Sequence, residues 1–71
     1  MRIYIEALEV PPEDAPEDYS PEFVRLDATG RDEAEVLADL RALLDPRKKY
    51  IIRRHYCGHD EGKPCRVEVI G

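Results

Sequence analysis

The sequence predicts an α+β domain of ββαββ order, in which a four-stranded, mostly antiparallel sheet carries one amphipathic helix packed on one face. Three observations predict it. Two short segments near the N-terminus alternate apolar and polar residues with the period of two that suits a strand, and two more near the C-terminus read as the strands of a hairpin. Another segment, between the second and third of these, spaces its apolar residues as a helix does. The chain has 71 residues, so we expect a single domain over residues 1–71.

The first two strands are expected over residues 2–10 and 22–28. In the first strand, alternation puts Ile3 on one face and Tyr4 on the other, and the second strand alternates in the same manner. Residues 11–21, which connect them, hold four prolines and four acids. Because proline cannot donate ladder hydrogen bonds, this connection is predicted to be an acidic, exposed loop.

A helix is expected to open at Thr29 and to stop at Pro46. Thr29 and Asp32 approximate a capping box, and the acids that follow place negative charge at the positive end of the helix dipole. The apolar positions of this segment recur at helical spacing and predict one continuous stripe against the sheet. They are Val36, Leu37, Leu40, Leu43 and Leu44.

Residues 50–57 and 65–70 read as the last two strands, joined in a hairpin. We expect Cys57 to lie opposite Cys65, since this register also creates one pair of opposite charge and one apolar pair. The other pairs of this register are Arg54 with Glu68, Ile52 with Ile70, His55 with Val67 and Arg53 with Val69.

The end of this hairpin gathers both cysteines and both histidines of the chain. His55, Cys57, His59 and Cys65 are the ligand types of tetrahedral zinc, and the hairpin would let all four converge. The spacing does not match a known zinc signature, because one residue separates Cys57 from His59 and seven separate the cysteines. Zinc is therefore one hypothesis for this cluster, and apart from it we expect no cofactor.

Three other hypotheses apply to the same residues. A disulfide between Cys57 and Cys65 would stabilise so small a domain. The cysteines could instead be ordinary reduced residues beside solvent-facing histidines. Catalysis by Cys57, with His55 or His59 as base, is not expected, because the chain lacks a glycine-rich or nucleophile-elbow pattern and is too small to enclose a substrate. We expect no enzymatic activity.

A basic segment precedes the cluster and suggests weak nucleic-acid binding. It alternates cations with aromatic rings, as single-strand binders do. Pairing of its arginines with acids on neighbouring strands is the alternative, and the net charge of −5 argues against strong nonspecific affinity. The candidate residues are Arg47, Lys48, Lys49, Tyr50, Arg53 and Arg54.

Composition and patterning favour a small cytoplasmic binding module. Charged residues make up 38% of the chain, and Asn and Gln are missing, which is typical of hyperthermophile proteins, although a salt-adapted or GC-rich genome would also explain it. No leader or membrane-spanning segment is apparent. One helix covers only one face of the sheet, so the leading hypothesis is a module that self-associates or docks a protein through the uncovered face. Candidates for that face are Tyr4, Leu8, Val10 and Phe23.

Overall fold

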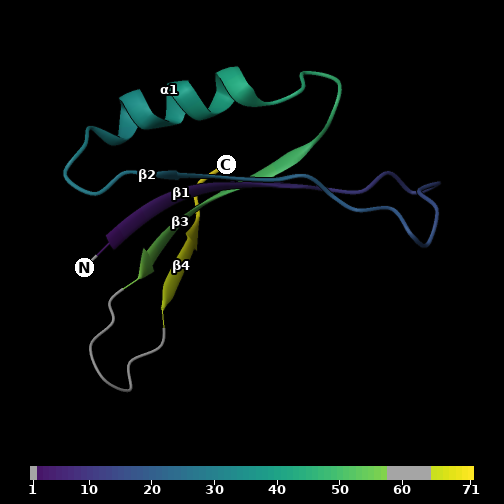
Figure 1. Ribbon diagram of the computed structural model, residues 1–71, viewed down its shortest axis with the longest axis horizontal. Coiled ribbons are helices and arrows are strands. Elements are labelled where there is room, and N and C mark those ends of the chain that lie inside the picture. Colours follow the sequence, from purple (N-terminus) through teal and green to yellow (C-terminus); the bar gives the residue numbers. More distant parts are fainter. Residues whose placement is uncertain (1, 58–64) are drawn as a thin grey trace.

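The computed structural model describes residues 2–57 and 65–71 and confirms the predicted α+β fold (Figure 1). All strands pair antiparallel in one open sheet of order β2-β1-β3-β4, and α1 lies across one face of it. The first and third strands are therefore the central ones, and their pairing joins residues far apart in the sequence. The elements are β1 (Arg2–Glu9), β2 (Phe23–Asp27), α1 (Glu33–Leu43), β3 (Tyr50–Cys57) and β4 (Arg66–Val69).

The helix begins later than predicted. Asp32 is its N-cap and accepts a hydrogen bond from the Ala34 amide, so the prediction that Thr29 opens the helix is wrong. Thr29 instead accepts a hydrogen bond from the Ile3 amide through Oγ1 (2.9 Å), which fastens the end of β2 to β1. Gly30 follows with a φ of 71°, a left-handed conformation that a helix cannot continue through.

The core lies between α1 and one face of the central strands. Val36 and Leu40 of the helix are fully buried against Ile5 and Ala7 of β1 and against Ile52 of β3. These positions alternate along β1 and fall on the helical stripe, as the sequence predicts. The predicted stripe is buried unevenly, because Leu43 is 59% exposed at the last turn of the helix.

The C-terminal hairpin has the predicted register. Arg54 lies opposite Glu68 and forms an ion pair with it (3.0 Å), and His55 lies opposite Val67. The ladder ends in a β-bulge, because the amides of Ile70 and Gly71 both donate to the Ile52 carbonyl (2.8 and 3.2 Å). Two residues thus oppose Ile52 where one was predicted.

Among the residues that the structure describes, no helix is both long and apolar enough to cross a membrane.

We expect Leu40→Asp to unfold the domain, since it would bury an unpaired charge at the centre of the core, at a cost of roughly 3–5 kcal/mol. Leu43→Asp is the matched control on the same helix, and we expect it to change the free energy of unfolding by about 0.5 kcal/mol or less because that side chain is exposed. Urea unfolding followed by circular dichroism measures both. Cooperative unfolding of Leu40→Asp at wild-type urea concentrations would place the core elsewhere.

Candidate functional site

Within the described part of the chain, no element covers the face of the sheet opposite α1 (Figure 1). This face carries an ordered set of side chains. Residues paired directly across strands share a face, so the register assigns them. One row across three strands is apolar, with Phe23 opposite Leu8 and Leu8 opposite Ile51. The next row is charged, with Arg25 opposite Glu6 and Glu6 opposite Arg53. The uncovered face thus has an apolar end and a charged centre.

Glu6 lies at the centre of this face and is fully buried, although no helix or strand among the described residues covers it. Arg25 donates to Oε2 of Glu6 through Nε (2.7 Å), and Arg53 donates to Oε1 (2.6 Å). The guanidinium of Arg25 also lies 4.8 Å from the centroid of the Tyr4 ring, in a cation–π contact. These long side chains lie over the carboxylate and exclude water from it.

Burial by itself would raise the pKa of the Glu6 carboxyl. The hydrogen bonds from Arg53, His55 and Arg25 outweigh burial, so the pKa lies below its ordinary value and the group is ionised at neutral pH. The pair of Arg53 with Glu6 confirms the alternative that arginines of the basic segment pair with acids on neighbouring strands. The burial of Glu6 was not predicted, because it sits at an outward-facing position where a solvated acid is the usual occupant. Only the pairing of β1 with two other strands brings two arginines to it.

His55 is oriented by the same carboxylate. Its Nδ1 lies 3.2 Å from Oε2 of Glu6, and because an ionised carboxylate only accepts, Nδ1 carries the proton and donates. In the neutral tautomer with the proton on Nδ1, Nε2 carries the lone pair. Nε2 is buried and has no hydrogen-bond partner within residues 2–57 and 65–71. A buried imidazole lone pair without a partner is ready to bind a cation.

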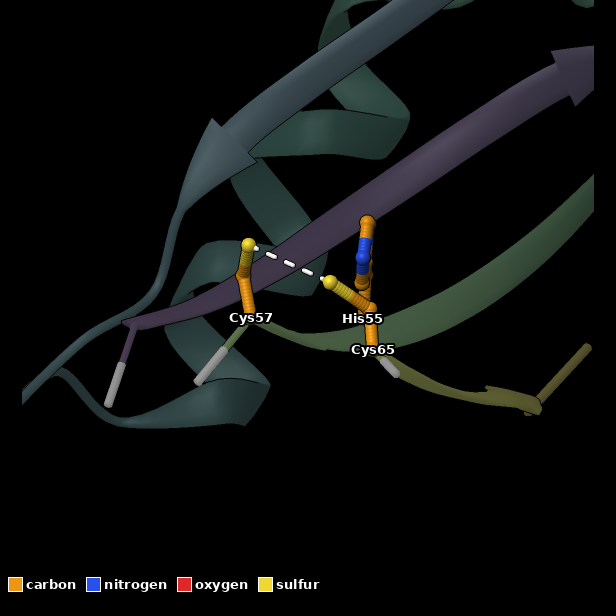
Figure 2. A group of neighbouring side chains, drawn as sticks. All are labelled: His55, Cys57 and Cys65. Atoms are coloured by element: carbon orange, nitrogen blue, oxygen red, sulfur yellow. Dashed lines mark hydrogen bonds between the residues drawn. The ribbon is translucent and has the colours of Figure 1, made fainter. Parts of the chain in front are cut away.

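Cys57 and Cys65 face each other at the end of the hairpin, on the same uncovered face as His55 (Figure 2). Their sulfurs are 3.4 Å apart, and the hydrogen bond from Cys65 to Cys57 raises the pKa of the Cys65 thiol. Hydrogen-bonded and non-hydrogen-bonded pairs alternate along an antiparallel ladder, and counting from the bonded Ile52 makes the cysteines a non-hydrogen-bonded pair. In an antiparallel ladder, side chains lie closer together at non-hydrogen-bonded pairs than at hydrogen-bonded pairs.

His55, Cys57 and Cys65 together form a metal-ligand cluster. One ligand atom from each lies within 4.8 Å of the other two. Bond lengths of about 2.3 Å to sulfur and 2.0 Å to nitrogen imply separations of about 3.4–3.8 Å around tetrahedral zinc. Side-chain rotations that move the ligand atoms by about an ångström would bring them to these separations. The fourth predicted ligand, His59, lies outside the described residues.

The predicted nucleic-acid segment does not form one surface. Alternation along β3 puts Arg53 on the uncovered face and Arg54 on the face that carries α1. Most of its polar groups already have acidic partners, and Lys49 is exposed. The ion pairs and hydrogen bonds are Arg47 with Asp45, Lys48 with Glu22, Tyr50 with Glu22, Arg53 with Glu6, and Arg54 with Glu33 and Glu68. Nucleic-acid binding through this segment stays a prediction that the geometry does not favour.

A second buried acid, Glu9, is the last residue of β1. It accepts hydrogen bonds from the Tyr19 hydroxyl and from the Glu22 amide (2.9 Å). The Tyr19 bond, then the Glu22 bond, lowers the pKa of Glu9. The residue thus ties the acidic loop to the sheet, which the loop's proline-rich composition did not predict.

Comparison of the chain with protein-family models, curated proteins and solved structures found no match.

We expect the protein to lose stability in acid. A carboxyl whose folded pKa is lowered stabilises the fold above its unfolded pKa, and this contribution is lost as pH falls through the folded value. The melting temperature should therefore fall below about pH 4.5. The difference in melting temperature between the Glu9→Gln variant and wild type should be largest near neutral pH and smallest in acid. A constant difference at every pH would contradict the pKa assignment for Glu9. The lowered carboxyls are Glu6, Glu9, Asp27, Glu33 and Asp45.

Proposed function

We propose that the protein binds a zinc ion at the hairpin end of the uncovered sheet face. The observation that carries the proposal is the convergence of His55, Cys57 and Cys65, whose ligand atoms lie within 4.8 Å of one another. Two sulfurs and one imidazole suit zinc better than hard cations such as calcium, which take oxygen ligands. The buried, unpartnered Nε2 of His55 supports the same conclusion, because a bound cation would satisfy it.

The hydrogen bond between Glu6 and His55 also supports this proposal. Histidine ligands of metals commonly donate their other ring N–H to a carboxylate, which fixes the tautomer and makes the ligating nitrogen more basic. The Glu6–His55 hydrogen bond of 3.2 Å has this arrangement. Arg25 and Arg53 hold Glu6 in turn, so the imidazole is oriented before any metal arrives.

Titration of the reduced, metal-stripped protein with zinc, in competition with a chromophoric chelator, should show one zinc per chain. Cys57→Ser and Cys65→Ser should each abolish this binding, since each removes a thiolate ligand. Glu6→Gln should weaken it by about 10–100-fold, because the imidazole loses its charged support. Replacement of zinc by cobalt should give a thiolate-to-metal charge-transfer band.

Glu9→Gln is the matched control for Glu6→Gln. Both are buried acids of β1 with several hydrogen-bond donors, but Glu9 contacts the acidic loop and not His55. It should bind zinc as wild type does. Equal losses in the two variants would mean that Glu6 acts through general stability, and unchanged binding in both cysteine variants would overturn the zinc proposal.

A second candidate function is self-association through the uncovered face, which the sequence favoured. The exposed apolar side chains on this face support it, and Phe23 and Ile51 remain 49% and 44% exposed at the two edges of the apolar row. Small sheets commonly cover such a face by packing against another sheet about 10 Å away. We propose that a second copy of the chain covers this face.

Sedimentation equilibrium should then detect a reversible dimer. Phe23→Glu or Ile51→Glu should weaken the dimer by about tenfold or more, because each places a charge in the apolar row. Leu43→Glu alters a side chain that is more exposed, at 59%, but lies on α1, and it should leave the association constant unchanged. A wild-type chain that stays monomeric across the accessible concentration range would exclude this function.

A further inference from the structure

We propose that Cys57 and Cys65 are also a redox couple that takes a small hydroperoxide as oxidant, and that forming their disulfide expels the zinc. This inference rests on the proposed function, since it gives the same site a second chemistry. It is carried by the placement of the two sulfurs relative to each other and to solvent.

The register places the two cysteines where a disulfide can form. Continued by one residue beyond Tyr56 and Arg66, the ladder puts them at a non-hydrogen-bonded position. Cα atoms at such positions are typically about 4.5 Å apart, within the range of about 4.4–6.8 Å found in disulfides. Their sulfurs are 3.4 Å apart and point toward each other (Figure 2). Bond formation at about 2.0 Å requires an approach of about 1.4 Å, which side-chain rotation supplies.

The oxidant has access to the pair. Cys65 is exposed on the edge side of the hairpin, while Cys57 is half-buried beside it. The thiolate of one cysteine attacks one oxygen of hydrogen peroxide, the O–O bond breaks, and a sulfenic acid forms as hydroxide leaves and takes the proton which that cysteine released, becoming water. The sulfur of the other cysteine then displaces the sulfenic hydroxyl, which leaves as water with the proton of that second cysteine. In total, two thiols and one peroxide give one disulfide and two waters.

Oxidation and zinc binding exclude each other at this site. Zinc needs both sulfurs as thiolates, and a disulfide has none. Once the cysteines are joined, His55 is the one member of the three-residue cluster that can still ligate. Linkage requires the reverse effect as well, so bound zinc should disfavour the disulfide at equilibrium. Because zinc also occupies both thiolates, it should slow their attack on peroxide.

The test uses the full chain in two steps. Zinc is first titrated into the reduced protein under anaerobic conditions. One equivalent of hydrogen peroxide is then added, while a chromophoric chelator records released zinc and intact mass records the loss of two hydrogens. We expect one zinc released per intramolecular disulfide, slower oxidation of the zinc-loaded than of the stripped chain, and rebinding after treatment with dithiothreitol. Cys65→Ser should form no intramolecular disulfide.

The outcomes separate the two proposals. A chain that binds zinc but yields sulfinic acid on one cysteine, or disulfides between chains, without coupled release of zinc overturns the redox inference and leaves the zinc site intact. Failure to bind zinc in the first step overturns the proposed function and the coupling together.

Discussion

Glu6 holds an ionised carboxylate at the middle of the sheet with none of its surface exposed to solvent. An unpaired charge in such a place would cost several kcal/mol, so its neighbours must supply donors. Arg25 on β2 and Arg53 on β3 do so from positions directly opposite it. A slip of either strand by one residue would move its guanidinium to the helix-covered face. The charge therefore restricts the register of three strands, together with the apolar alternation beneath it.

This network also orients His55 in the candidate metal site. His55 needs no metal to be oriented, because Glu6 fixes both its tautomer and its ring. The cysteines, by contrast, are placed by the hairpin and lie at the end of β3 and just before the start of β4. The proposed site would thus join one ligand that is held by hydrogen bonds to two ligands that only the hairpin places, and the proposed change between a metal-bound and an oxidised form requires movement of the two sulfurs alone.

Local patterns in the sequence were enough to predict most of the fold. Alternation located the first two strands, and the opposed charges of Arg54 and Glu68 indicated the hairpin register. Pairing of the basic segment's arginines with acids such as Glu6 was one alternative from the sequence. The particular partners could not be derived, because β1 pairs with β3 across 47 residues and no local pattern fixes that register. The helix start was misplaced for a different reason: Thr29 and Asp32 can both cap a helix, and the bond from Ile3 to Thr29 decided between them.

Successive residues of β3 direct their backbone hydrogen bonds to opposite sides of the strand. Its odd-numbered residues direct their amides toward the central strand β1, whereas Ile52, Arg54 and Tyr56 direct theirs toward the short edge strand β4. Amide hydrogen exchange at successive residues of one strand therefore reports on two different interfaces. Fast exchange confined to the even positions would mean that β4 detaches as a local unit while the rest of the sheet stays folded, and the two cysteines would separate in every such opening.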